Sequence, residues 1–183
     1  LDMRMNRMAG KTAADICNTY SEPVLTGVFR EYGELRNARE LSRAIVSARS
    51  LAPLETTNGL RQVVLPLAER GNESQYMARV FQALRIEVND ELASLKEFLQ
   101  QCAEVIKPGG RLVVISYHSL EDRLVKNYLM QGRFEGEAEK DLYGNVEQLP
   151  FRQLTRKPIE PGSDEVARNP RARSAKMRIA TKN

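Results

Sequence analysis

The sequence pattern changes abruptly at residues 107–110 (Lys-Pro-Gly-Gly), and this change limits what the chain can fold into. Before it, apolar residues recur at steps of three and four over most of residues 12–106, which indicates a series of amphipathic helices. After this helix stop and turn, residues 111–117 form an almost unbroken apolar run, typical of a buried parallel strand. Helical spacing returns over residues 119–130. This order of elements predicts part of a wound α/β domain with a helical insertion, in a chain that is mostly helical.

Local signals predict where the elements begin and end. Thr12 can cap a helix that runs through Thr19, and Glu22-Pro23 opens a second helix that Gly33 closes. Further helices are expected from residue 35 to Pro53, from Thr56 or Thr57 to Gly71, and from Ser74 to Ile106 with one break. Residues 131–150 read as a loop, and residues 151–154 and 175–180 as short strands.

The composition excludes some classes of protein without selecting one. Cys17, Cys102 and the only histidine, His118, are too few and too far apart for a metal site, so we expect none. Both cysteines lie in apolar-spaced helical stretches, which favours buried thiols in a reducing, cytoplasmic compartment. No apolar run is long enough to cross a membrane, so no membrane partner is expected. The net charge of +4 suits a polyanionic partner but does not demonstrate one.

His118 stands where the predicted buried strand ends and the next helix begins. Ligands of wound α/β sheets bind at the carboxyl ends of strands, so His118 is a candidate substrate residue. Ser119 shares this position and is a candidate pocket residue. The competing interpretation is that Ser119 caps the helix and Asp122 completes a capping box of related type.

Two further stretches are candidates for binding. Gln82, Arg85 and Asn89 share one helical face beside the apolar stripe, where they line a cleft or form a structural hydrogen-bonded seam. Residues 166–183 contain only basic charges. Arg171 and Arg173 in an expected loop can contact phosphates, whereas the alternative is a solvated strand face.

These stretches together resemble the small-subunit ribosomal RNA methyltransferase H family. The resemblance covers the whole chain in the family's order, so it is highly specific. Its one mild departure is Tyr117, where the family often has phenylalanine. The matching blocks are residues 1–5 (LDMRM), 32–34 (YGE), 78–92 (ARVFQALRIEVNDEL), 108–112 (PGGRL), 116–123 (SYHSLEDR) and 169–174 (NPRARS).

The resemblance implies a fold, an activity and a domain division. The fold is the carboxyl-terminal part of a class I, Rossmann-like, S-adenosylmethionine-dependent methyltransferase sheet with an inserted helical domain. Residues 1–8 and 74–183 would belong to the sheet domain and residues 9–73 to the insertion. The activity is methyl transfer from S-adenosylmethionine to the exocyclic N4 of a cytidine in the decoding region of 16S rRNA. The implied partner is 16S rRNA or the small ribosomal subunit.

The family's glycine-rich donor loop has no counterpart in this sequence. The chain contains no G-x-G-x-G pattern, so donor-binding residues are expected upstream of Leu1 and the chain alone is expected to be inactive. We expect Asp2 and His118 to be the catalytic polar partners of the cytosine. Arg4, Gln82, Arg85, Asn89 and Ser119 would line the substrate pocket, and Arg171 and Arg173 would hold RNA phosphates.

Two other functions remain open at this stage. The chain could be a non-catalytic RNA-binding module derived from the methyltransferase, which would bind RNA in a salt-dependent way without turnover. It could instead be a protein-interaction domain with an exposed apolar patch on its helices. Part of a parallel sheet leaves an edge and a face uncovered, so we also expect self-association, for which a homodimer is the simplest form, or loose order in the sheet.

Overall fold

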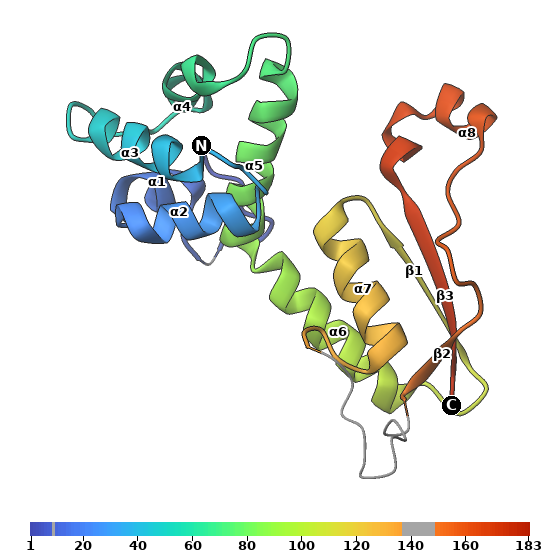
Figure 1. Cartoon of the computed structure of the whole chain (residues 1–183). Helices are drawn as coiled ribbons and strands as arrows, with labels where there is room; N and C mark the ends of the chain where they lie inside the picture. The colour runs from blue at the N-terminus through green and yellow to red at the C-terminus, as the bar shows by residue number, and fades with distance from the viewer. Residues whose placement is uncertain (9, 137–148) are drawn as a thin grey trace. The chain divides into compact units, whose positions relative to one another are not determined.

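The computed structural model describes residues 1–8, 10–136 and 149–183 and divides the chain into two compact units (Figure 1). The first unit, Leu1–Glu91, is helical, and the second, Leu92–Asn183, contains the sheet. Each unit buries an apolar cluster of its own. The predicted division into residues 1–8 with 74–183 and residues 9–73 rests on the family's domain plan rather than on compactness, and it stays a prediction.

The helical unit follows the predicted order of elements closely. Its elements are α1 (Ala13–Thr19), α2 (Glu22–Glu31), α3 (Ala38–Arg49), α4 (Thr57–Val64), the 3-10 turn η1 (Leu65–Leu67) and α5 (Glu73–Asn89). Thr12 caps α1 as expected: its hydroxyl accepts the N–H of Asp15 at 3.1 Å, and the Asp15 carboxylate accepts the N–H of Thr12 at 2.8 Å. The Thr56 hydroxyl caps α4 by accepting the N–H of Gly59. The apolar stripes of these helices meet in one core, whose fully buried members include Ile16, Leu25, Phe29, Leu41, Ile45, Leu60 and Leu84.

The turn at residues 32–34 packs directly against α5. A Cβ on Gly33 would lie 2.8 Å from the carbonyl oxygen of Phe29 and 3.2 Å from that of Arg79, so only glycine allows this close approach. Glu34 follows in the left-handed region, with φ of 49°. The Tyr-Gly-Glu block therefore holds the end of α2 against the helix that carries Gln82, Arg85 and Asn89.

The long helical pattern is broken once, as predicted. Asp90 adopts φ of 49° and ends α5, and α6 (Glu91–Val105) begins at the next residue. The turn at residues 107–110 then leads into the first strand. Gly109 has φ of 79°, and a Cβ on Gly110 would lie 2.6 Å from the Ile106 side chain, so both glycines are required by the turn.

In the described part of the sheet unit, three strands form one sheet with helices packed on one face (Figure 1). Its elements after α6 are β1 (Arg111–Ser116), α7 (Ser119–Gln131), β2 (Phe151–Gln153), α8 (Ser163–Arg168), the 3-10 turn η2 (Pro170–Ser174) and β3 (Lys176–Lys182). The strand order is β1-β3-β2, and β3 runs antiparallel to both neighbours. Both strands predicted near the carboxyl end are confirmed.

The prediction that residues 111–117 form a buried parallel strand is wrong for the chain as described. β1 pairs antiparallel with β3, and its burial alternates: Leu112 and Ser116 are buried, whereas Val113 and Ile115 are about half exposed. Leu112 faces the cluster that includes Leu99 of α6 and residues of α7. Apolar side chains on both faces cannot reveal strand direction, and here only one face is covered. Self-association through the open face stays a prediction.

Smaller expectations have mixed outcomes. Cys17 and Cys102 are both buried and free, as expected, and burial raises the pKa of Cys17 to about 12. The expected loop over residues 131–150 falls largely outside the described residues, and α8 and η2 were not predicted. None of the described helices is long and apolar enough to cross a lipid bilayer. Among the described residues, no cluster of three or more acidic, histidine or cysteine side chains could hold a metal ion.

Candidate functional site

Asp2 and Arg4 form a clasp at the start of the helical unit. The Asp2 carboxylate accepts hydrogen bonds from Arg4 Nε at 2.7 Å and Nη2 at 3.0 Å, and from the Arg4 backbone N–H at 3.2 Å. The guanidinium bonds, followed by the backbone bond, lower the pKa of Asp2 to about 2. Asp2 is exposed and ionised at neutral pH, so its carboxylate can only accept hydrogen bonds.

Asn89 at the end of α5 holds the segment that carries this clasp. Its amide nitrogen donates to the carbonyl oxygen of Met3 at 2.9 Å, and its amide oxygen accepts the N–H of Met5 at 2.8 Å. Between these two bonds Met3 stays in the left-handed region with φ of 65°, a strained conformation for a side chain other than glycine. Asn89 therefore lies against residues 3–5, and the prediction that it lines a substrate pocket with Arg4 stays a prediction.

Gln82 and Arg85 lie near this segment but already have protein partners. Gln82 Nε2 donates to the carbonyl oxygen of Tyr32 at 3.0 Å, and Arg85 forms two hydrogen bonds with Glu91 at 2.8 and 3.0 Å. Both residues, with Met3 and two residues of α5, line a hollow of about 440 Å³. Gln82 and Arg85 therefore both line a hollow and form structural hydrogen bonds, as the two alternative interpretations of the sequence expected. Their role in binding stays a prediction.

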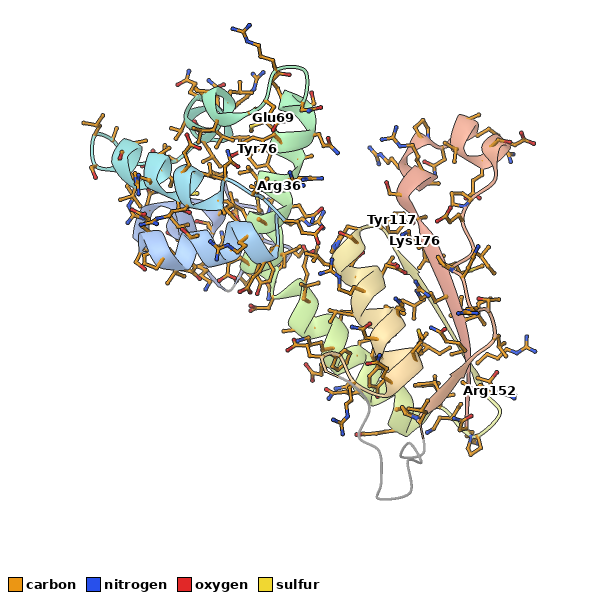
Figure 2. All side chains as sticks on the ribbon, in the orientation of Figure 1. Arg36, Glu69, Tyr76, Tyr117, Arg152 and Lys176 are labelled. Carbon is orange, nitrogen blue, oxygen red and sulfur yellow. The ribbon has the colours of Figure 1, made fainter. Side chains whose placement is uncertain are left out.

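A second hollow in the helical unit, of about 330 Å³, includes none of the predicted site residues. Figure 2 labels Arg36, Glu69 and Tyr76, which line it. The Tyr76 hydroxyl donates to Asn37 Oδ1 at 3.0 Å, and Asn37 Nδ2 donates to the carbonyl oxygen of Leu67 at 3.2 Å. These polar groups satisfy one another, so no buried donor or acceptor points to a ligand there.

His118 lies at the carboxyl end of β1, in the turn that opens α7. Figure 2 shows Tyr117 at this end of β1 and Lys176 at the beginning of β3, and the strand register pairs Lys176 with Ser116. The His118 side chain is 11% exposed, whereas Tyr117 remains 57% exposed. The predicted position at a strand end is confirmed, although His118 itself is mostly covered.

The expected capping box of Ser119 and Asp122 is wrong. The N-cap is His118: its Nδ1 accepts the N–H of Glu121 at 3.4 Å, and the Glu121 carboxylate accepts the N–H of His118 at 3.3 Å. Ser119 is the first residue of α7 rather than its cap. The capping rules favour a serine over a histidine as the cap. The predicted capping box was therefore displaced by one residue from the observed one. Whether Ser119 contacts substrate stays a prediction.

Asp122 instead forms a buried ion pair with β3. Its two carboxylate oxygens accept from Arg178 Nε at 2.7 Å and Nη2 at 3.0 Å, and Lys176 Nζ lies 3.9 Å from Oδ2. Both side chains of the pair are nearly covered, 12% exposed for Asp122 and 7% for Arg178. This pair joins α7 to β3, so one arginine of the basic tail has a structural role.

Arg171 and Arg173 are exposed on η2. Within the described part of the chain, neither guanidinium has a hydrogen-bond or ion-pair partner. Ala172 between them is buried and anchors the turn. Both cations are therefore available to phosphates, in contrast to Arg178.

Sequence reasoning missed three residues that hold the candidate side chains. Glu121 contacts His118, Glu91 binds Arg85, and the carbonyl of Tyr32 accepts from Gln82. Glu121 had a detectable signal, since a glutamate three residues after a helix cap is the usual partner in a capping box. Glu91 lies beyond a helix break and Tyr32 contributes backbone, so spacing on one helix could not reveal them.

The described residues do not build a site for S-adenosylmethionine, the donor that the resemblance implies. Gly109 and Gly110 form the turn before β1, at the amino end of that strand, whereas sheets of this type bind ligands at the carboxyl ends. Both glycines are needed to connect α6 with β1 rather than to approach a ligand. No step of the chemistry can therefore be assigned to a donor bound by this chain alone.

Comparison with known proteins agrees with the resemblance along the whole chain. The profile of the MraW methylase family matches residues 1–183. Similar curated proteins include "Ribosomal RNA small subunit methyltransferase H" from Phocaeicola vulgatus, 55% identical over 182 residues, and from Parabacteroides distasonis, 54% identical over 182 residues. The protein of that name from Cytophaga hutchinsonii is 56% identical over 180 residues.

These alignments cover 98–100% of this chain but only 59–60% of each relative. The chain therefore spans about 60% of the length of the curated relatives that it matches. The family also confirms the predicted fold class, the carboxyl-terminal part of a class I methyltransferase fold. This chain belongs to the MraW methylase family.

Proposed function

We propose that this chain forms the acceptor side of an S-adenosylmethionine-dependent rRNA methyltransferase that methylates the exocyclic N4 of a cytidine in the decoding region of 16S rRNA. The names of the relatives support an RNA substrate from the small ribosomal subunit. The observation that carries the proposal is the ionised Asp2 carboxylate, held by Arg4 and by the bonds from Asn89 to its segment.

The chemistry of the acceptor explains why such a carboxylate is useful. An amino group conjugated to a pyrimidine is a weak nucleophile, so it must be aligned with the methyl group and must lose a proton as the bond forms. Its N–H groups can donate to Asp2. With a pKa of about 2 this carboxylate is a weak base, so we assign it to orienting the amino group, and the proton that the nitrogen loses passes to solvent water.

The remaining predicted residues are assigned to the acceptor and its RNA. His118 at the end of β1 is assigned to the acceptor site as a residue that packs beside the base, because both of its ring nitrogens face Glu121. Arg4, Gln82, Arg85, Asn89 and Ser119 are assigned to its surroundings. Arg171 and Arg173 contact RNA phosphates, which supplies affinity without sequence preference. The target base must leave its stack to be reached. The donor-binding residues lie on chain that precedes Leu1, so the 183-residue chain alone has no methyltransferase activity.

A chimera tests this proposal. The part of the Phocaeicola vulgatus relative that this chain does not match would be joined before Leu1, and methyl transfer from labelled donor to small ribosomal subunits would be measured. We expect transfer to cytidine N4 by the chimera and none by the chain alone. Asp2→Asn should lower the rate about a hundredfold, because orientation of the acceptor is lost. Glu73→Gln, which changes an exposed carboxylate at the start of α5, should leave the rate intact.

Arg171 and Arg173, which have no partner within the described residues, also favour a second candidate, a non-catalytic RNA-binding module. That function predicts salt-dependent RNA binding by the chain and no methyl transfer by a correctly folded chimera. If the Asp2→Asn chimera transfers methyl groups at an unchanged rate, the protein is an enzyme but Asp2 does not act in its site.

A further inference from the structure

The geometry points to Glu121 as the positioning residue that fixes the imidazole of His118 in one orientation and one tautomer, with the proton on Nε2. Its meaning for catalysis rests on the proposed function, but the arrangement can be tested without it. The predicted site does not include Glu121.

Glu121 meets both nitrogens of the imidazole. Its backbone N–H points to His118 Nδ1 at 3.4 Å, so Nδ1 presents its lone pair and the ring proton belongs on Nε2. Within the described residues, Nε2 is buried and no group meets it with hydrogen-bond geometry, while Glu121 Oε1 lies 3.3 Å from it. A buried N–H that faces a carboxylate oxygen at this distance is the arrangement that costs least free energy.

The second carboxylate oxygen fixes the backbone of the same turn. Glu121 Oε2 accepts the N–H of Tyr117 at 2.8 Å and the N–H of His118 at 3.3 Å. Burial raises the pKa of Glu121, but the bonds from His118 and the Tyr117 N–H outweigh burial, so the pKa lies below its ordinary value. Glu121 is therefore an ionised side chain with an N–H group facing each of its carboxylate oxygens.

Only a carboxylate can satisfy this arrangement. A glutamine at position 121 has one acceptor oxygen, which the two backbone N–H groups would claim, and its NH2 group would then face the Nε2 proton of His118. Two donors would meet, so the imidazole would have to turn or move its proton to Nδ1, where the Glu121 N–H already donates. The neighbouring Asp122 cannot replace Glu121, because Arg178 occupies both of its oxygens.

The sequence allows a direct test on the chain as it is. His118 is the only histidine, so the ¹⁵N spectrum of histidine-labelled protein reports this one ring. At about pH 8.5, above the usual titration range of imidazole, we expect a single tautomer protonated at Nε2. Glu121→Gln should give a mixture of tautomers, and exchange of the Nε2 proton with solvent should become about tenfold faster.

Asp15→Asn is the matched control. It removes the acidic partner of the other capping box, between Thr12 and Asp15, without touching His118. It should leave the histidine spectrum unchanged. A merely structural role for Glu121 would lower the melting temperature in Glu121→Gln while the tautomer stayed the same, and that result would overturn the proposal.

The unsubstituted chain provides a second measurement if Glu121→Gln does not fold. A ring protonated at Nδ1, or an exchange-averaged mixture in the unsubstituted protein, would overturn the proposal by itself. Absence of methyl transfer by the chimera would count against the proposed function and not against this arrangement. Conversely, an active chimera in which the His118 ring is disordered would support the proposed function and contradict the positioning role of Glu121.

Discussion

Two arginine–carboxylate pairs have the same geometry in different surroundings. Asp2–Arg4 in the helical unit and Asp122–Arg178 in the sheet unit each join Nε at 2.7 Å and Nη2 at 3.0 Å to the two carboxylate oxygens. The first pair is exposed and spans two residues of sequence, whereas the second is buried and spans 56. Geometry alone therefore does not separate a structural pair from one available to a substrate.

Burial makes the difference because it determines what each pair gives up on folding. The Asp122 and Arg178 charges have lost water, so each depends on the other for compensation. The Asp2 and Arg4 charges keep solvent and contribute little to stability, which leaves the carboxylate free to exchange water for a substrate N–H group. The comparison assigns the sheet-unit pair to architecture and the helical-unit pair to the candidate site.

Removal of one partner of the buried pair should have the largest effect on stability. We expect Arg178→Met to lower the free energy of unfolding of the sheet unit by about 3–5 kcal/mol, because Asp122 keeps a buried charge and Lys176 Nζ lies 3.9 Å away. Chemical denaturation, monitored by hydrogen exchange in β3, would measure this loss of unfolding free energy. The double variant Asp122→Leu with Arg178→Met should recover most of the loss. A small effect of Arg178→Met would show that solvent reaches this pair. The contrast between a buried and an exposed pair would then be wrong.

Loss of the Asn89 amide should have an intermediate effect. Asn89→Ala removes the bonds to Met3 and Met5, so we expect a loss of about 1–3 kcal/mol and faster exchange of the Met5 N–H. Asn58→Ala, at an exposed asparagine of α4, is the matched control. If Met5 stays protected in Asn89→Ala, then the left-handed turn at Met3 is held by other contacts.

The predictable features of this fold were those encoded within a few residues. The Thr12 cap and the glycine turn before β1 follow from local rules of helix and turn formation. One break in the long helical pattern was also expected, but its position at Asp90 was not. The direction of β1 did not follow, because an apolar run is compatible with either pairing. It needed the partner strand, Lys176–Lys182, more than 50 residues away.

The candidate site shows the same limit. Asn89 and Asp2 were each identified from the sequence, but the hydrogen bonds that bring their segments together join residues 84 and 86 positions apart. The partner of Arg178 could not be read from its basic surroundings, since Asp122 lies on another element. His118 was placed correctly at the strand end. Its capping role was missed because histidine is not among the preferred caps.

Replacement of the two exposed arginines should change binding and leave stability nearly unchanged. Arg171→Ala with Arg173→Ala should alter the free energy of unfolding by less than about 0.5 kcal/mol, because neither has a protein partner within the described residues. Affinity for a single-stranded RNA should fall, and the slope of log affinity against log salt should flatten by about one unit per lost contact. A lower melting temperature with an unchanged salt slope would instead show that Arg171 and Arg173 have a structural role, as Arg178 has.

The smallest effect should appear when acid opens the exposed pair. The hydrogen bonds from Arg4 lower the pKa of Asp2 from 3.8 to about 2, so any stabilisation by this pair is fully present above pH 3.8 and is lost as the pH falls toward 2. The carboxyl carbon resonance of Asp2 and the exchange of the Arg4 Nε proton should change together over this interval. Because both charges face water, the melting temperature should hardly reflect the change. Asp2→Asn should abolish the change at Arg4 while leaving the rest of the acid transition in place. Titration of Asp2 near 3.8 would mean that the clasp does not persist in solution, and the carboxylate would then lack the fixed orientation on which its role at the acceptor depends.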